Sequence, residues 1–282
     1  MSISWGAGPF PGLRAEPGLF FTTMSQKKRS VRLVTEKDIK GFFHVHTTDS
    51  DGLSSMEEIV RATGQSGYRY VGITDHSQSA YYAGGLKAGD LVRQRKEVER
   101  LRKRYPRVTI FWGIESDILS DGALDYPPAL LREFDFIIVS IHSRFDLSKK
   151  EQTRRIIKAL KNPYATLLGH PTGRLLKSRP GYEVDMIQVI DAAADYGKGI
   201  EINSHPHRLD LDWRFCPYAR EKGVLLAINP DAHSTGGIQT IPLGVAVARK
   251  GGLTKADILN THSAREVAQF FSQCRGRSKE GA

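Results

Sequence analysis

The chain has 282 residues, of which 40% are hydrophobic and 26% are charged, a composition typical of a soluble globular protein with room for one large α/β domain and its tails. No apolar run is long enough to cross a bilayer and two cysteines cannot form a disulfide framework, so we exclude a membrane-spanning or disulfide-stapled protein and expect a cytoplasmic one. The formal net charge of +10 suits a polyanionic partner such as nucleic acid.

The first 40 residues are interpreted as a tail and a lead-in segment. Residues 1–23 are rich in glycine and proline and lack both helical and strand periodicity, so they are predicted to be disordered. They also lack the pattern of a signal peptide. Met24 begins a segment of ordinary composition, and one hypothesis is that translation starts there rather than at Met1. The intact mass of the native protein distinguishes the two starts.

From residue 41 to residue 273, short apolar runs alternate with helical stretches, which we interpret as one domain. The runs are FFHVH, YVGITDH, VTIFWGIE, FIIVSIH, ATLLGH, GIEIN and VLLAIN, and their β-branched residues are typical of buried parallel strands. Helices are predicted at 55–65, 88–105, 127–133, 149–160, 183–196, 212–221 and 237–249, followed by a helical pair within 254–273 and a polar tail at 274–282. Seven such units predict a closed or nearly closed α/β barrel.

Each predicted strand ends in, or is soon followed by, a side chain that can bind a metal ion. Parallel strands bring these ends to one edge of the sheet, where the catalytic residues of such barrels lie. His44 and His46 are two residues apart and so share one face of a strand, and Asp231 and His233 repeat this spacing. GIEIN ends at Asn203. The candidate metal ligands are His44, His46, Asp51, His76, Glu115, His142, His170, Asp231 and His233.

This donor set predicts a metal-dependent hydrolase. Nine donors are too many for one ion and suit two or three, with Glu115 as the candidate bridge because it comes from the middle of the strand order. Imidazole mixed with carboxylate favours Mn²⁺, Zn²⁺ or Fe²⁺. Clustered divalent ions suit phosphoester hydrolysis, so the expected nucleophile is a metal-bound hydroxide with Glu115, Asp231 and His233 nearest to it. No Walker loop or GxSxG motif competes with this interpretation.

Phosphate substrates need cationic or polar side chains beside the metals. Ser143, Arg144, Arg174 and Arg208 follow predicted strands in loops on the same face, so they are candidate substrate-binding residues. The alternative for each arginine is an ordinary salt bridge within its loop.

Three further features have two interpretations each. His205 and His207 flank Pro206, which favours loop or substrate-contact residues over metal ligands. The stretch SQSAYYAGGL after His76 is long enough to overhang the site, where its tyrosines either stack on a nucleobase or pack over the barrel mouth. Much of the basic charge lies within 27–32 and 93–107, as a nucleic-acid surface or as a solvated helix face.

The motifs HVHTTDSDG, ITDHS, GIESDI, VSIHSRF, GHPTGRLL, EIN…RLDL and DAHST resemble those of a PHP (polymerase and histidinol phosphatase) domain, and most closely the PHP domain at the C-terminus of bacterial family X DNA polymerases. The resemblance covers Leu33 to Phe271. It implies a distorted (βα)₇ TIM-like barrel with a trinuclear metal centre, whose nine ligand positions fall on the nine residues named above. Pro230 departs from the pattern, because relatives usually have a Ser or Thr hydroxyl there.

The function implied by the resemblance is that of a metal-dependent phosphoesterase acting on DNA 3′ ends or nucleotides, similar to a Mn²⁺-dependent 3′–5′ exonuclease. The residues before position 41 leave no room for polymerase and helix-hairpin-helix regions, which argues against processive action on DNA and makes a separate DNA polymerase the candidate partner. One alternative is a histidinol-phosphate phosphatase or another small-molecule phosphatase. A non-enzymatic alternative is a DNA- or polymerase-binding accessory module, against which the complete ligand set speaks.

Overall fold

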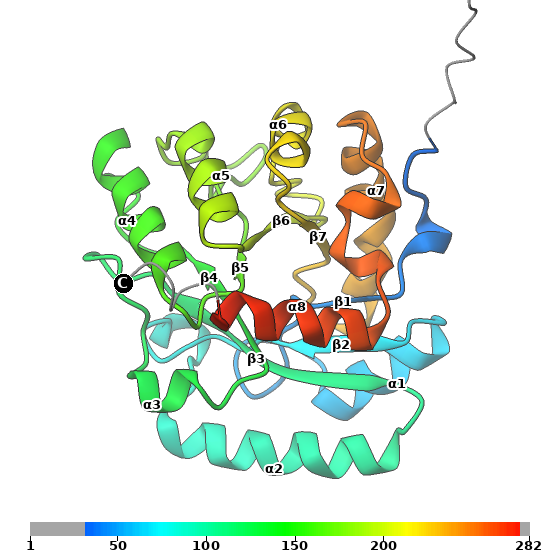
Figure 1. The fold of residues 1–282 in the computed structure, drawn as a ribbon. Helices are drawn as coiled ribbons and strands as arrows, with labels where there is room; N and C mark the ends of the chain where they lie inside the picture. Colours follow the sequence, from blue (N-terminus) through cyan, green and yellow to red (C-terminus); the bar gives the residue numbers. More distant parts are fainter. Residues whose placement is uncertain (1–31, 277–282) are drawn as a thin grey trace, which may run out of the picture. The chain divides into compact units, whose positions relative to one another are not determined.

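The computed structural model describes residues 32–276, which fold around seven parallel strands that follow one another in sequence order (Figure 1). The fold class predicted from the sequence, a nearly closed (βα)₇ barrel, is confirmed. The predicted disorder of residues 1–23 lies outside the described residues. The strands are Gly41–Phe42 (β1), Tyr70–Ile73 (β2), Thr109–Asp117 (β3), Phe136–Ser140 (β4), Leu167–Leu168 (β5), Gly199–Asn203 (β6) and Leu226–Asn229 (β7).

Six of the described helices connect successive strands around the barrel, a seventh follows the last strand, and the final helix lies across an end of the barrel (Figure 1). Ser55 and Ser148 begin two of them as capping boxes, each accepting the N–H of the glutamate three residues later. No helix within residues 32–276 is long and apolar enough to cross a membrane. The helices are Met56–Gln65 (α1), Ala88–Arg104 (α2), Pro128–Leu131 (α3), Lys149–Lys161 (α4), Met186–Asp195 (α5), Cys216–Glu221 (α6), Ile241–Lys250 (α7) and Ala264–Gly276 (α8).

The first and last strands meet at a seam that closes the barrel with few backbone hydrogen bonds. Just beyond the ends of β1 and β7, Val45 and Ala232 form an isolated parallel bridge. The N–H of His46 donates to the carbonyl of Ala232 at 2.9 Å, and the N–H of Ala232 donates to the carbonyl of His44 at 3.2 Å. This bridge places the residues that flank Val45 beside those that flank Ala232.

Side-chain amides take the place of the backbone ladder along the rest of the seam. The Asn229 Oδ1 atom accepts from the N–H of Phe43 at 3.0 Å. Asn260 reaches both strands, since its Nδ2 donates to the carbonyl of Gly41 at 3.0 Å and its Oδ1 accepts from the N–H of Ile228 at 2.6 Å. These amides satisfy buried backbone groups that would otherwise lack partners.

The predicted helical pair within 254–273 is wrong in its first half. That stretch forms two short 3₁₀ turns, Lys255–Asp257 and Leu259–Thr261, and only α8 is a full helix. Asn260 is fully buried, and a regular helix would have to compete with its hydrogen bonds across the seam. The long-range contact therefore overrides the local helical pattern.

The predicted polar tail at 274–282 starts too early, because α8 continues to Gly276. Cys274 is fully buried, and its carbonyl accepts from the ammonium of the buried Lys198 at 2.7 Å. Arg275 donates to the carbonyl of Phe134. Residues 277–282 lie outside the described part of the chain.

An aromatic floor fills the end of the barrel where the strands begin. The rings of Phe136 and Phe271 stack with centroids 4.8 Å apart and an interplanar angle of 13°. Phe43 packs against both of them, at 5.8 Å and 5.4 Å between ring centroids. A Cβ atom at Gly72 or Gly113 would lie 2.5 Å from the ring of Phe136, so glycine at both positions makes room for it.

We expect Phe136→Ala to lower the free energy of unfolding by about 3–5 kcal/mol, because it removes a fully buried ring from a rigid cluster. Urea denaturation followed by circular dichroism measures this change. Val92→Ala, at a side chain that is 58% exposed, serves as the control and should change stability by about 0.5 kcal/mol or less. Equal effects of the two substitutions would contradict a tightly packed floor.

Candidate metal centre

All nine candidate ligands gather where the strands end, opposite the aromatic floor. Their nitrogen and oxygen atoms form four overlapping groups in which every ligand atom lies within 4.8 Å of the others. The predicted convergence is thus present in the structure, whereas the role of each residue as a metal ligand stays a prediction. The groups are His46, Asp51, His76 and His233; His44, His46 and Asp231; His44, Glu115 and His170; and His76, Glu115 and His142.

Glu115 lies at the centre of the cluster, near the end of β3. Its Oε1 atom is 2.9 Å from Nε2 of His170, 3.2 Å from Nε2 of His44 and 3.3 Å from Nε2 of His142. Its Oε2 atom is 3.0 Å from Nδ1 of His76. Glu115 is the only carboxylate that belongs to two of the four groups, and its two oxygens face different imidazoles. This is the geometry that a bridging carboxylate needs.

The other two carboxylates each face a separate pair of imidazoles. Asp231 Oδ1 is 3.3 Å from Nε2 of His46 and 3.5 Å from Nε2 of His44. Asp51 Oδ2 is 3.4 Å from Nε2 of His233 and 3.6 Å from Nε2 of His76. The cluster therefore divides into three neighbourhoods, one around each carboxylate.

The turn that carries Asp51 is held in place by a buried carboxylate that the sequence analysis missed. Asp75 accepts hydrogen bonds from the N–H of Thr47 at 2.7 Å and from the hydroxyl of Ser50 at 2.5 Å. Its other oxygen accepts from the amide of Gln94, on α2, at 2.7 Å. Asp75 thereby ties the turn to α2 and fixes where Asp51 lies.

Two more carboxylates that sequence reasoning missed orient candidate ligands. Glu201 Oε1 is 2.7 Å from Nδ1 of His44, and Asp117 Oδ1 is 2.6 Å from Nδ1 of His142. Each contact occupies one ring nitrogen and turns the other toward the cluster, as carboxylates behind metal-binding histidines do. Asp117 lies two residues after Glu115 on the same strand, so the two-residue spacing that identified the histidine pairs could have found it.

Asn203, the last residue of β6, hydrogen-bonds two carboxylates of the site. Its Nδ2 donates to Glu201 Oε2 at 3.1 Å and to Asp231 Oδ2 at 3.0 Å. Arg208 Nε also lies 3.0 Å from Asp231 Oδ2. The second oxygen of Asp231 therefore has two donors, although Pro230 supplies no hydroxyl there.

Buried atoms without hydrogen-bond partners indicate that the cluster fits cations. Both ring nitrogens of His46, Nε2 of His44, Nδ1 of His76 and Oε2 of Glu115 are buried and accept or donate no hydrogen bond. Unpaired buried polar atoms are costly, and here they point toward one another. Imidazole and carboxylate donors in this arrangement match the ligand types of Zn²⁺, Mn²⁺ and Fe²⁺.

The electrostatics of the cluster show how strongly the buried carboxylates require positive charge. Burial lowers the pKa of His76, but the charges of Glu115 and Asp51 outweigh it and raise the pKa to about 10. Burial together with the nearby His76 lowers the pKa of His46 to about 3. Burial would raise the pKa of Glu115, but the charges of His142 and His44 hold it well below its usual range. Cations would displace protons from such a site.

Two of the candidate substrate-binding arginines differ in position. Arg208 is paired with Asp231, and its side chain is 18% exposed beside the cluster. Arg174 instead bonds the carbonyl of Arg208 at 2.8 Å and Asp212 at 3.0 Å. The contacts of Arg174 are therefore those of an ordinary salt bridge within its loop, which was the alternative to substrate binding.

Ser143 and Arg144 lie in the exposed loop after β4. Arg144 pairs with the exposed Asp146 at 3.3 Å. The carbonyl of Ser143 accepts from the buried Arg155 of α4 at 2.9 Å, which anchors the loop. Both residues directly follow His142 in the sequence. Their contact with substrate stays a prediction.

His205 and His207 belong to none of the four groups, which agrees with their interpretation as loop residues. Their ring centroids lie 5.5 Å apart, and the backbone N–H of His205 donates to Oδ1 of Asn203 at 3.0 Å.

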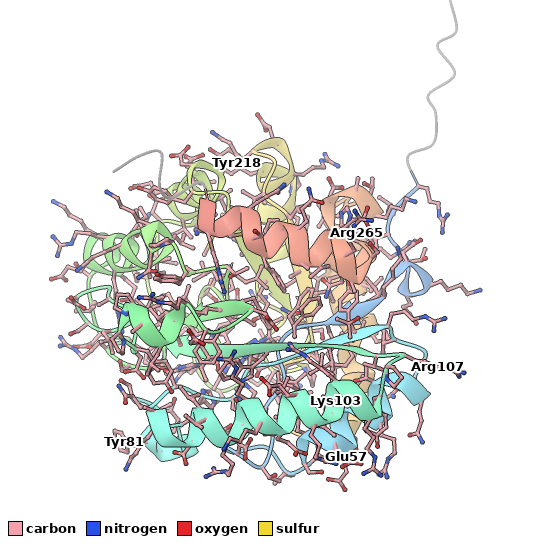
Figure 2. The ribbon with its side chains drawn as sticks, turned by 60° about the horizontal axis from the view of Figure 1, so that its bottom comes forward. Glu57, Tyr81, Lys103, Arg107, Tyr218 and Arg265 are labelled. Carbon is pink, nitrogen blue, oxygen red and sulfur yellow. The ribbon has the colours of Figure 1, made fainter. Side chains whose placement is uncertain are left out.

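Most arginines of α2 are engaged by neighbouring acids rather than free for a polyanion. Arg95 pairs with Glu133, Arg100 with Glu57 and Arg102 with Asp135, at 2.5 Å, 2.6 Å and 2.6 Å. Figure 2 labels Lys103 on this helix and Glu57 of α1, the partner of Arg100. The solvated helix face is the better interpretation of this charge run.

Comparison with known proteins identifies relatives of two kinds. The PHP domain profile matches residues 43–205. The DNA polymerase/3′-5′ exonuclease PolX of Bacillus subtilis (strain 168) is 40% identical over 244 residues, which cover 86% of this chain and 43% of the relative. This chain therefore spans less than half of that relative. A probable phosphatase of Thermoanaerobacter sp. (strain X514) is 30% identical over 235 residues, which cover 77% of this chain and 89% of the relative.

A solved structure shares the fold. Histidinol phosphate phosphatase from Lactococcus lactis subsp. lactis, complexed with zinc, L-histidinol and phosphate, superposes with a TM-score of 0.54 at 15% identity and covers 76% of this chain and 94% of its own. At this identity the likeness concerns the fold alone.

The resemblance noted in the motifs is confirmed, including the likeness to family X polymerases. The matched profile spans more than half of the chain, and the Thermoanaerobacter relative is matched over most of its length. This relationship agrees with the expected enzyme class, a metal-dependent phosphoesterase. The chain belongs to the PHP domain family.

Proposed function

We propose that residues 41–273 form a metal-dependent phosphoesterase that hydrolyses phosphodiester bonds at DNA 3′ ends or in nucleotides. The observation that carries the proposal is the cluster of nine imidazole and carboxylate side chains, divided into three neighbourhoods at one mouth of the barrel. Clustered cations at such a mouth suit phosphoester hydrolysis. The PolX relative, named as a 3′-5′ exonuclease, supports a nucleic-acid substrate.

We infer three cation positions from the three neighbourhoods, with Glu115 shared between two of them. Divalent ions bound there would supply hydroxide near neutral pH and neutralise phosphate charge. The zinc in the Lactococcus lactis relative supports Zn²⁺ as one candidate, beside Mn²⁺ and Fe²⁺. The three sets are His44, His46 and Asp231 with Glu115; His142 and His170 with Glu115; and Asp51, His76 and His233, where His76 also lies 3.0 Å from Glu115 Oε2.

The residues around the centre have distinct proposed roles. Glu201 and Asp117 hold the rings of His44 and His142 in the orientation that presents Nε2. Arg208 bonds Asp231 through Nε, and we propose that its terminal nitrogens bind a phosphate oxygen. No serine or cysteine nucleophile is required by this arrangement.

A small-molecule phosphatase is the second candidate function. The Thermoanaerobacter relative, named a probable phosphatase, is matched over 89% of its length and is thus similar in extent to this chain. Histidinol phosphate is the first small substrate to test, because the solved relative of the same fold was complexed with L-histidinol and phosphate. The PolX relative, named a DNA polymerase, supports a DNA polymerase as the proposed partner.

The proposed function predicts a ladder of 3′-shortened products when the protein is incubated with Mn²⁺ and a 5′-labelled single-stranded oligonucleotide. EDTA should abolish the ladder, since the buried donors need cations to act. Denaturing gel electrophoresis is the measurement. Release of phosphate from histidinol phosphate without any ladder would favour the small-molecule phosphatase. Oligonucleotide binding without any hydrolysis would favour the accessory module.

We expect His142→Ala to lose at least one bound metal ion and to lower kcat by about 100-fold or more, because it removes a donor that faces Glu115. Metal content by mass spectrometry and turnover of bis-p-nitrophenyl phosphate test this together, and circular dichroism checks the fold. His262→Ala, at a partly exposed histidine outside the four groups, is the matched control and should retain both. Full metal content and activity in His142→Ala would remove this residue from the site.

Asp117→Asn should weaken metal binding by about 10–100-fold, because it removes the charge that orients His142. Competition with a chelator measures the affinity, and the melting temperature of the metal-free protein should stay close to the wild-type value. Asp146→Asn neutralises an exposed carboxylate in the following loop and is the matched control. An unchanged affinity in Asp117→Asn would contradict the positioning role.

A further inference from the structure

Exposed apolar side chains lie on two segments next to the candidate metal centre. Leu53, Tyr81 and Tyr82 are 82%, 86% and 63% exposed, more than any other large hydrophobic side chain in the part of the chain that the structure describes. Packing over the barrel mouth, the alternative considered for the tyrosines from the sequence, does not account for rings left so open. Exposed apolar groups that gather at one place commonly mark a binding surface.

The tyrosine turn is held rigidly despite its exposure. Tyr81–Ala83 forms a short 3₁₀ turn. On one side of it, Asp125 accepts from the N–H of Ser79 at 2.6 Å, and the carbonyl of Asp125 accepts from Gln78 at 2.9 Å. On the other side, the N–H of Leu86 donates to the carbonyl of His76 at 2.8 Å. A surface fixed in this way loses little conformational entropy when a ligand binds to it.

Both apolar segments lie beside candidate ligands. The ring centroid of Tyr82 lies 6.5 Å from that of His76. The N–H of Leu53 donates to the carbonyl of His233 at 2.6 Å.

The arrangement of the two rings suits a flat ligand. The rings of Tyr81 and Tyr82 have centroids 6.1 Å apart and an interplanar angle of 78°. A planar group can therefore stack on one ring while its edge or face contacts the other. Figure 2 shows Tyr81 pointing outward at the edge of the molecule, beside the start of α2. This position is open to a substrate that extends beyond the metal centre.

We propose that Tyr81 and Tyr82, with Leu53 on the neighbouring turn, form a platform that stacks on the base of a nucleotide whose phosphate occupies the metal centre. The inference rests on the proposed phosphoesterase function and specifies how the same site selects its substrate. Phosphate contacts alone cannot distinguish a nucleotide from other phosphate esters, whereas aromatic stacking binds every nucleobase through its π face.

The test compares two 5′-labelled single-stranded oligonucleotides that differ only in the 3′-terminal nucleotide, which is either natural or abasic. The readout is the ratio of kcat/KM for the natural end to kcat/KM for the abasic end in Mn²⁺. The double substitution of Tyr81→Ala and Tyr82→Ala should lower this ratio by about tenfold. The matched pair Tyr81→Phe and Tyr82→Phe keeps both rings and should keep the ratio.

A second measurement separates this inference from the proposed function. Fluorescence anisotropy in EDTA reports binding of the same two oligonucleotides without hydrolysis, and wild-type protein should bind the natural end more tightly. Wild-type protein that hydrolyses neither oligonucleotide would overturn the function, while the anisotropy still tests the platform. A kcat/KM ratio or binding preference that is unchanged in the double alanine variant would overturn the platform, and Val92→Ala controls for loss of an exposed apolar side chain.

Discussion

The seam between the first and last strands is the constraint on which the candidate centre depends. Phe43 and Asn229, 186 positions apart in the chain, are joined across it. The bridge between Val45 and Ala232 lies between two pairs of candidate ligands, so the residues on either side of each bridge partner share the interior face. A shift of this register by one residue would turn the whole set away from the centre. The side-chain amides of Asn229 and Asn260 hold the register where backbone pairs are few.

Burying so many ionisable groups at one mouth has an energetic cost that the rest of the fold has to offset. Glu115 is fully buried, and several nitrogens around it lack hydrogen-bond partners. Isolated buried charges are strongly unfavourable, so the metal-free cluster depends on protonated imidazoles for balance. The aromatic floor at the opposite end contributes apolar burial that does not depend on any cation. The floor thus contributes stability that does not depend on cations in the candidate metal centre.

Local pattern predicted the seven strands, most of the helices and the convergence of the nine candidate ligands, because parallel strand ends share one edge and alternate residues share one face. It missed Glu201, since a carboxylate inside a strand does not reveal which histidine it contacts, and it missed Asp117, although the two-residue spacing from Glu115 could have identified that residue. It also assigned a helix around Asn260, where hydrogen bonds to two distant strands decide the backbone instead. The charge run of α2 could not be judged from sequence, because Glu133 and Asp135, which neutralise it, come from another segment.

The inner part of the mouth holds the candidate metal ligands, and the outer part carries the exposed side chains of the rim. The imidazoles and carboxylates in its depth face one another. Behind them, Asp75 and Glu201 have hydrogen bonds on both carboxylate oxygens, and Asp117 contacts His142. Little of that set is left to contact the organic part of a substrate. Arg208, partly exposed and tied to Asp231, lies at the boundary. We therefore propose that selection among phosphate esters comes from side chains around the rim, where Leu53, Tyr81 and Tyr82 are the most exposed large hydrophobic side chains of the described residues.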